Sequence, residues 1–255
     1  MSNIKSKNKY ELCYPILEYD KVLFMDKVAS LEKEKNKLLE LRIDYLLKSC
    51  VSIDEIIMII NYIHIDLTQK KIIVTIRTEA EGGKVSLDDK AYYNYIEKLY
   101  LHTSVEYLDV EYNMYSKNES NYDKLFKNKY KKVILSNHIF DKALSKRKYE
   151  SLFNNMTKTH IDYVKCATYV KTKKELFDFM ITARKCSKNI NNMRKECVFI
   201  AMGEIGGLSR LWPEFTNTKI VFLTAYGENA NKIGQFTYEN FVKYRNLLEK
   251  IIKKW

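Results

Sequence analysis

The sequence predicts one α/β domain of the (β/α)₈ barrel class, and three observations lead to this prediction. The chain has 255 residues, which is near the usual size of an eight-stranded α/β barrel. Eight apolar runs of strand length alternate with segments of helical period, as in repeated β-α units around a parallel sheet. All seven glycines fall where predicted strands are followed by helices, on the loops that carry the chemistry of barrel enzymes.

The predicted elements follow from the apolar runs and from the helix start signals between them. In chain order, the strands cover Tyr10 to Ile16, Leu38 to Leu46, Lys71 to Thr78, Val105 to Tyr112, Lys132 to Ser136, Tyr163 to Val170, Cys197 to Met202 and Ile220 to Ala225. Ser52 to Glu55 and Thr172 to Glu175 each fit a capping box at the start of a helix. A last helix, from Thr237 to about Lys254, closes the ring. We therefore expect residues 1–255 to form one domain, with residues 1–9 as a flexible tail.

The composition predicts a cytoplasmic protein with reduced thiols and without a metal. No stretch approaches the ~20 apolar residues of a membrane span, and the lysine-rich start lacks the apolar core of a signal peptide. The five cysteines include no Cys-x-x-Cys pair and the four histidines lie far apart in the sequence. Neither a disulfide framework nor a zinc site is therefore expected.

The formal charge of +12 could indicate a nucleic-acid partner, because clustered lysines and arginines release counterions from phosphates. The lysines are scattered, however, over predicted helix faces and the two termini. We therefore expect neither a nucleic-acid nor a membrane partner. The charge is interpreted as a solvated surface whose positive field attracts an anionic small molecule.

Charged side chains recur on predicted strands that should be apolar. Residues two apart in a strand share a face, and a parallel barrel strand is covered on both sides. Such charges must be paired or must line the mouth of an active site. The groups are Glu40, Arg42 and Asp44 on the second strand, Thr75, Arg77 and Glu79 on the third, Asp109 and Glu111 on the fourth, and Ser136 and His138 at the end of the fifth. Their recurrence near the ends of several strands favours an active site over separate structural ion pairs.

Lys165 lies in the middle of the sixth predicted strand, where a lysine is rarely buried without a reason. Desolvation and neighbouring cations such as Arg42 and Arg77 would favour the neutral amine, which can attack a carbonyl carbon to form a Schiff base. The alternative is a structural lysine that neutralises Glu40 or Glu111 in a salt bridge.

His138 is the candidate general base, because imidazole titrates near neutral pH. For a histidine that stands alone, a core residue bonded to a backbone carbonyl would be the better interpretation. Glu81, just before the Gly82-Gly83 loop, could orient His138 and tune its charge. The remaining histidines have no predicted role; they are His64, His102 and His160, in or at the ends of helical segments.

Along nearly the whole chain, and in order, these residues resemble the type I 3-dehydroquinate dehydratase family, the Schiff-base enzymes of the shikimate pathway. The matching motifs are Leu39-Glu40-Leu41-Arg42-Ile43-Asp44, the segment from Thr75 to Gly83 with its Arg-Thr-x-x-Glu-Gly-Gly signature, Ser136-Asn137-His138-x-Phe140, Tyr163-Val164-Lys165, the loop from Met202 to Arg210, and Gly234-Gln235. Several of these motifs are specific by themselves, and their common order argues against coincidence.

The resemblance implies a reaction without a cofactor, in an enzyme that is often a homodimer. Lys165 would form an imine with the C3 ketone of 3-dehydroquinate, and His138, held by Glu81, would remove the adjacent proton. The substrate-binding residues would be Glu40, Arg42 and Arg77 for ring hydroxyls, Arg210 for the carboxylate, and Asn231 and Gln235 in a lid over the ring.

The lid departs from the family pattern. Family members usually have Ser-Ala-Pro-Gly-Gln or a close variant, whereas this chain reads Asn231-Lys232-Ile233-Gly234-Gln235, at the end of a shortened stretch from Tyr226. The loss of proline and of small residues predicts altered substrate affinity or lid closure.

Two other functions stay open on the sequence alone. A class I aldolase barrel also uses a strand lysine as an imine, and glycines after the seventh and eighth strands often bind phosphate. Arg210 with Gln235, which suit a carboxylate, and His138 as a base argue against an aldolase. A degenerate barrel could instead bind RNA or another partner, but the retention of every candidate catalytic group argues against that function.

Overall fold

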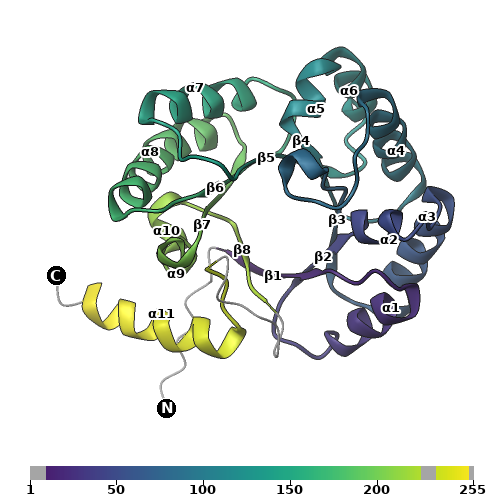
Figure 1. Ribbon diagram of the computed structural model, residues 1–255, viewed down its shortest axis with the longest axis horizontal. Coiled ribbons are helices and arrows are strands. Elements are labelled where there is room, and N and C mark those ends of the chain that lie inside the picture. The colour runs from purple at the N-terminus through teal and green to yellow at the C-terminus, as the bar shows by residue number, and fades with distance from the viewer. Residues whose placement is uncertain (1–9, 225–233, 253–255) are drawn as a thin grey trace.

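In the computed structural model, eight parallel strands form a barrel at the centre of the molecule (Figure 1). The structure describes residues 10–224 and 234–252, so the predicted tail, residues 1–9, lies outside it. The strands are β1 (Glu11–Ile16), β2 (Leu38–Arg42), β3 (Lys71–Thr75), β4 (Tyr107–Glu111), β5 (Lys132–Ile139), β6 (Tyr163–Tyr169), β7 (Glu196–Met202) and β8 (Ile220–Phe222). They pair in the order β7-β6-β5-β4-β3-β2-β1-β8, and a bridge between Cys197 and Thr218 closes the ring. The (β/α)₈ prediction is confirmed.

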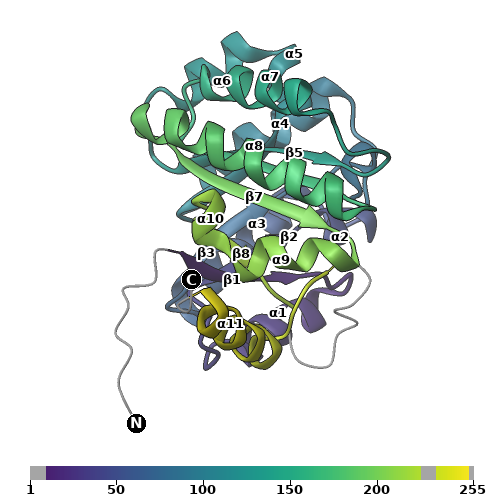
Figure 2. The same cartoon turned by 90° about the vertical axis from the view of Figure 1, so that its left-hand side faces the viewer.

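Helices follow the strands and surround the barrel (Figure 1). They are α1 (Lys21–Ser30), α2 (Asp44–Lys48), α3 (Ile53–Tyr62), α4 (Asp89–His102), α5 (Tyr112–Lys117), α6 (Glu119–Phe126), α7 (Lys146–Thr157), α8 (Lys173–Asn192), α9 (Gly207–Leu211), α10 (Pro213–Thr216) and α11 (Tyr238–Ile252). Short turns of π or 3₁₀ geometry cover Ile63–Leu67, Glu79–Glu81 and Glu204–Gly206. The last helix, α11, packs against α9 (Figure 2).

Both predicted capping sites hold a side-chain cap. At α8 the box is complete, because the Thr172 hydroxyl accepts from the Glu175 amide and the Glu175 carboxylate accepts from the Thr172 amide. At α3 the Ser52 hydroxyl accepts from the Glu55 amide at 3.2 Å. These caps satisfy amide groups that have no partner inside the first helical turn.

Several strand ends differ from the prediction, and for β2, β3 and β5 local structure accounts for the difference. β2 ends at Arg42 because the next residues turn into α2, where the Asp44 carboxylate binds the Arg42 guanidinium. β3 ends at Thr75, and Glu79 lies in a 3₁₀ turn with 55% of its side chain exposed. β5 continues to Ile139 because it keeps pairing with β6. Asp44 and Glu79 therefore do not share the strand faces predicted for them.

The apolar core has one part between barrel and helices and a second part inside the barrel. The inner part includes Cys13, Leu38, Ile73, Tyr107, Ile134, Tyr163, Val198 and Ile220. Burying one large apolar side chain contributes about 1.5–3 kcal/mol to the stability of the fold, so this inner cluster stabilises the end of the barrel where the strands begin. Because it fills the barrel from the amino-terminal ends of the strands, polar side chains at the carboxyl ends can surround a cavity.

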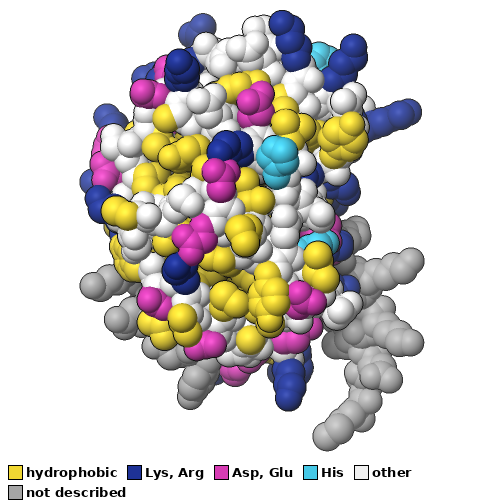
Figure 3. All heavy atoms as spheres, turned by 90° about the vertical axis from the view of Figure 1, so that its right-hand side faces the viewer, with side chains coloured by type: hydrophobic (Ala, Val, Ile, Leu, Met, Phe, Trp, Pro, Cys, Tyr) yellow, Lys and Arg dark blue, Asp and Glu magenta, His cyan; other side chains and the backbone are white. Residues whose placement is uncertain are grey.

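The outer surface carries charges of both signs. Figure 3 shows lysines and arginines interspersed with acidic and hydrophobic side chains on the side of α3 and α4. Here Lys98 pairs with Asp54 and Lys117 pairs with Asp89, each at 2.7 Å. Such exposed pairs contribute only about 0–1 kcal/mol each, as is typical of solvated helix faces. None of the helices within residues 10–224 and 234–252 has the length and apolar character needed to span a membrane.

Candidate active site

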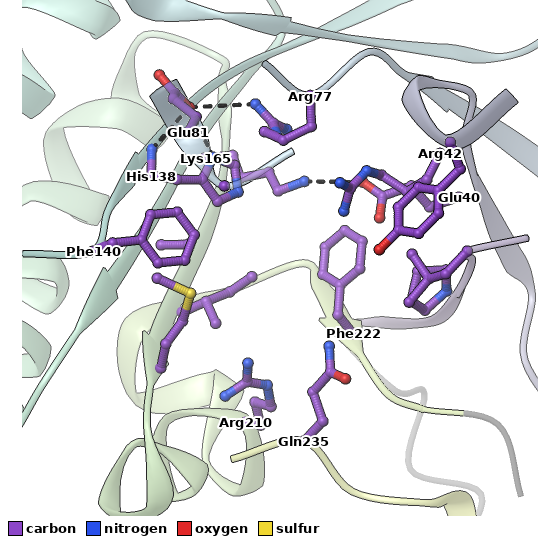
Figure 4. A pocket seen from close by; sticks show the side chains of 17 residues that line it. Glu40, Arg42, Arg77, Glu81, His138, Phe140, Lys165, Arg210, Phe222 and Gln235 are labelled. Carbon is purple, nitrogen blue, oxygen red and sulfur yellow. Dashed lines mark hydrogen bonds and ion pairs between the residues drawn. The ribbon is translucent and has the colours of Figure 1, made fainter. Parts of the chain in front are cut away.

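A cavity of about 270 Å³ opens at the carboxyl ends of the barrel strands (Figure 4). Of the predicted site residues, those that line it are Glu40, Arg42, Arg77, Glu81, His138, Lys165, Arg210 and Gln235. Asn231 lies outside the described residues. Residues that are far apart in the sequence thus meet at the catalytic face of the barrel.

Lys165 projects from β6 into the middle of this cavity (Figure 4). Its amine lies 2.9 Å from Asp109 Oδ2 and 3.3 Å from Glu40 Oε1, and 4.4 Å from the centre of the Phe222 ring. The side chain therefore forms salt bridges, as a structural lysine would, and also points into the cavity, as a Schiff-base lysine would. The expected contact with Glu40 is present, whereas the suggested contact with Glu111 is wrong, because Asp109 occupies that place.

Two other lysines, Lys131 and Lys195, are also buried among the described residues. Both precede a strand and donate hydrogen bonds to backbone carbonyls at the amino-terminal end of the barrel. Their amines are hydrogen-bonded to these carbonyls, and neither lysine lines the cavity. Burial alone therefore does not distinguish Lys165; its access to the cavity does.

Arg77 connects three buried carboxylates around the cavity. Its guanidinium lies 2.7 Å from Asp109, 3.2 Å from Glu111 and 3.3 Å from Glu81. Burial lowers the pKa of Arg77, but the three carboxylates outweigh burial and raise it above its ordinary value. For Asp109, burial raises the pKa, and Arg77 with Lys165 reverses this, so the pKa lies below its ordinary value. Both groups are therefore charged at neutral pH, and the guanidinium of Arg77 is bound mainly by carboxylates of the protein itself.

His138 and Glu81 form a hydrogen-bonded pair on the cavity wall. Glu81 Oε2 lies 2.9 Å from His138 Nδ1 and accepts from the His138 backbone amide at 3.0 Å. Asn113 donates to the other carboxylate oxygen of Glu81 at 3.1 Å. Burial, followed by the charges of Arg77 and Lys165, holds the pKa of His138 well below its ordinary value. The imidazole is thus neutral at pH 7, as a general base must be.

Arg210 approaches the cavity from the loop after β7, and Figure 4 shows it beside Gln235, across from His138 and Glu81. Its side chain is buried, donates one hydrogen bond to the Ala201 carbonyl at 2.8 Å, and has no partner for Nε among the described residues. Burial lowers the pKa of Arg210 to about 10. A buried guanidinium with an unused donor has the chemistry to bind a carboxylate.

Arg42 is held in place by its own neighbours on the β2 side of the cavity. Its Nε and Nη2 atoms donate to the two carboxylate oxygens of Asp44 at 2.7 and 2.9 Å. The guanidinium also lies 5.4 Å from the centre of the Tyr45 ring. Asp44 in turn accepts from the backbone amide of Lys84, which ties α2 to the loop after β3.

The Gly82-Gly83 loop brings Arg77, Glu81 and Phe140 close together. Gly82 has φ +82°, a conformation that disfavours side chains, and a Cβ atom there would lie 2.5 Å from the Phe140 ring. A Cβ atom on Gly83 would lie 1.8 Å from the carbonyl oxygen of Arg77. The two glycines are therefore needed for the position of Glu81 beside His138.

The model of the type I 3-dehydroquinase family matches residues 12–252 of this chain. The chain belongs to this family. A 3-dehydroquinate dehydratase of Streptococcus suis (strain 98HAH33) is 29% identical over 214 residues, which cover 83% of this chain and 88% of the relative. A catabolic 3-dehydroquinate dehydratase of Acinetobacter baylyi is 29% identical over 196 residues, covering 75% and 69%.

Solved structures of 3-dehydroquinate dehydratases share the barrel. The enzyme from Clostridium difficile, solved with covalently modified comenic acid, matches with a TM-score of 0.84 and 22% identity over 94% of this chain and 92% of that chain. The 3-dehydroquinate dehydratase of Geobacillus kaustophilus gives a TM-score of 0.83 and 17% identity over 95% and 92%. At these identities the structures support the fold alone.

The sequence assigns no role to several residues that line this 3-dehydroquinase cavity or contact the groups that line it. Asp109 stands out in the sequence as a charge on a buried strand, but its partner does not. Asn113, on α5, and Tyr45, on α2, lie outside the strands, so no strand pattern marks them. Phe222 is apolar like most strand residues and therefore gives no signal. No group of metal-binding side chains was found within the part of the chain that the structure describes.

Proposed function

We propose that this type I 3-dehydroquinase converts 3-dehydroquinate to 3-dehydroshikimate by a syn dehydration through an imine on Lys165. The observation that carries the proposal is the position of the Lys165 amine, within one cavity that His138 and Arg210 also line; the Nε atom of Arg210 has no partner among the described residues. A keto acid fits these groups, because the amine can attack its ketone and the guanidinium can bind its carboxylate.

In the proposed reaction, Lys165 attacks the C3 ketone and water leaves, which gives an imine. The imine withdraws electrons from C2, so neutral His138 removes a C2 proton and an enamine forms. The protonated His138 then assists departure of the C1 hydroxyl, and hydrolysis of the imine releases the product. Glu40, Arg42 and Arg77 are proposed to bind the ring hydroxyls, and Gln235 with Asn231 to close over the ring.

The proposal also includes the location, the oligomeric state and the pathway of the enzyme. We infer a cytoplasmic homodimer that acts in the shikimate pathway, in accordance with the family to which the chain belongs. Light scattering of the purified protein tests the dimer, and growth of a dehydratase-deficient bacterium on minimal medium tests the pathway. The residues Asn231-Lys232-Ile233 suggest that the lid changes the affinity for the substrate. Weaker substrate binding would be measured as a raised KM.

The direct test is the ultraviolet absorbance of the conjugated enone product, measured with 3-dehydroquinate as the substrate. Steady enone formation by the wild-type protein supports the proposal. Turnover of a phosphorylated aldehyde without enone formation would favour the aldolase. Salt-dependent RNA binding by a folded protein that forms no enone would favour the binding barrel.

Removing the carboxylate-binding guanidinium should weaken substrate binding without weakening the fold. Truncating one partner of a buried charge pair costs about 2–5 kcal/mol, so we expect Arg210→Met to lower kcat/KM about 30-fold or more. Within residues 10–224 and 234–252 no carboxylate pairs with the buried Arg210, and burial lowers its pKa, which means that its charge opposes folding. The thermal midpoint of Arg210→Met should therefore not fall. The matched control is Arg147→Met on the exposed surface of α7.

We also expect kcat/KM to rise with pH toward about 8, because burial raises the pKa of the Glu81 carboxyl to about 8. Below that pH, the carboxyl donates its proton to His138 Nδ1, and the other ring nitrogen then carries the hydrogen and cannot accept one. Above it, the carboxylate accepts from Nδ1 and the other nitrogen is free to act as the base. Glu81→Gln should lose this rise, whereas the control Glu204→Gln, exposed on the loop after β7, should keep it. Identical profiles for Glu81→Gln and wild type would contradict the assignment.

A further inference from the structure

Exposed apolar side chains gather on the outer surface over α3, the turn that follows it and the end of α4 (Figure 3). Met58, Tyr62 and Ile65 follow one another at helical spacing, and Leu101 of α4 lies beside them. The four residues, here called the α3 patch, are between 45% and 72% exposed. Apolar patches of this kind on a globular protein commonly mark an interaction surface.

Contacts between α3 and α4 place Leu101 next to the residues of α3. Lys98 of α4 pairs with Asp54 of α3 at 2.7 Å. Leu101 follows Lys98 by one helical turn. Met58 follows Asp54 by one turn, so its side chain lies next to that of Leu101. Further along, the Asn61 side chain bonds to the backbone at the end of α4. The two helices are thus fixed side by side, and the patch is continuous.

A hollow of about 300 Å³ adjoins the patch at the end of α4. Its lining includes Leu101 of the patch, Ser104 and the exposed ring of Tyr130. The Asn61 side chain accepts a hydrogen bond from the Ser104 amide at 3.3 Å, which connects the hollow to α3. Protruding apolar side chains beside a hollow allow two surfaces to interlock, as in the closely packed centre of protein interfaces.

Charge distinguishes this patch from the rest of the surface. Residues 49–69 contain no lysine or arginine, although the chain has 44 of them and a formal charge of +12. The two acidic residues of α3 pair with lysines of neighbouring helices, Asp54 with Lys98 at 2.7 Å and Glu55 with Lys21 at 2.5 Å. At physiological ionic strength charges act over about 8 Å, so repulsion between two copies depends on the charges where they meet. The stretch that carries most of the α3 patch brings no positive charge to such a contact.

Two other helices expose apolar side chains, but they do so among basic residues. Phe177 and Ile181 on α8 are about half exposed, as are Leu247 and Ile251 on α11. Both helices contain more basic than acidic residues. Two copies that met through α8 or α11 would bring like charges together, which lowers affinity. The α3 patch is free of this penalty.

We propose that the α3 patch is the surface through which two copies of this chain associate, with α3 against α3 about a twofold axis. The inference rests on the homodimer of the proposed function and names its interface. A twofold contact uses the same surface on both copies, so this surface must be compatible with itself. An apolar surface without positive charge meets this condition in a chain of charge +12. Exposed side chains of one copy fill the hollow beside Leu101 of the other.

Sedimentation equilibrium of the full chain, over a range of protein concentrations, tests this interface. We expect the double variant Met58→Lys/Ile65→Lys to raise the dissociation constant of the dimer about 100-fold or more, because like charges then face each other in the contact. The matched control Phe177→Lys/Ile181→Lys adds the same charges to α8 and should keep the wild-type constant. Circular dichroism verifies that both variants are folded, and Leu101→Lys replaces the patch variant if it is not.

A mixing experiment separates a direct contact from a general loss of association. Met58→Glu/Ile65→Glu should also be monomeric alone, because its negative charges repel each other. An equimolar mixture of the lysine and glutamate variants should form a heterodimer that high salt weakens, since opposite charges then face each other. The proposal would be overturned by a monomeric wild type, by a lysine variant with the wild-type dissociation constant, by an α8 control that dissociates as readily, or by a mixture that stays monomeric.

Enone formation keeps this inference distinct from the proposed reaction. The described residues that line the cavity all belong to one chain, so the monomeric lysine variant should form enone at about the wild-type rate per subunit. A dimer that dissociates as expected but forms no enone would refute the dehydratase and leave the interface intact. Wild-type protein that forms enone as a monomer would refute the interface and the homodimer, and leave the dehydratase intact.

Discussion

A His138→Gln variant is expected to dehydrate 3-dehydroquinate about 100- to 10,000-fold more slowly than wild type, the range lost when a general base is removed. Glutamine can still donate a hydrogen bond to Glu81, but it cannot take the proton at C2. Lys165 and its two carboxylates are unchanged, so the imine should form. Borohydride should therefore trap an adduct on Lys165 in a variant that produces almost no enone.

The control for this prediction is His160→Gln, because His160 is exposed and lies outside the cavity. It should match the wild type in enone formation and in trapping. If His138→Gln keeps most of the wild-type rate, another group removes the C2 proton and the pair with Glu81 has a structural role.

Replacing Arg77 by methionine is expected to cause the largest loss of stability of any change around the cavity. The variant leaves Asp109 and Glu111 without their common cation and Glu81 without a hydrogen-bond donor, at sites where all three side chains are buried. Removing one partner of a buried ion pair costs about 3–5 kcal/mol, so we expect the free energy of unfolding to fall by at least this amount. Urea titration followed by circular dichroism at pH 7 measures the change.

Arg77→Lys and Arg147→Met complete this experiment. Lysine keeps the charge but has no planar fork, so it should recover only part of the loss. The exposed Arg147 should change the free energy of unfolding by about 0.5 kcal/mol or less. A loss below about 1 kcal/mol in Arg77→Met would show that Asp109 and Glu111 are neutral or solvated, and would contradict the network described here.

The barrel could be predicted from the sequence because the apolar runs of its strands and the capping residues of its helices are local signals. Thr172 and Glu175, for example, belong to one helical turn and form the predicted box. Strand ends are harder to predict, because they depend on tertiary contacts. Asp44 is the first residue of α2, and its carboxylate accepts from the backbone amide of the distant Lys84, whereas an alternating pattern alone extends the strand through Asp44.

The clustering of the site residues was also predictable, because charges on strands buried on both sides need partners or a cavity. Which charges pair with one another was not. The choice between Asp109 and Glu111 as the partner of Lys165 depends on the other groups that each carboxylate binds. Glu111 binds Arg77 and accepts from the backbone amide and the hydroxyl of Thr78, whereas Asp109 binds the Lys165 amine.

The central claim is that Lys165 is the nucleophile of a dehydratase, and borohydride trapping with 3-dehydroquinate tests it most directly. The account predicts a reduced adduct on the peptide that contains Lys165, none on the peptides of the buried Lys131 and Lys195, and enone formation that Lys165→Ala abolishes. An adduct without enone would place the defect in a later step, at the base or the lid. Folded wild-type protein that gives neither an adduct nor enone would contradict the account.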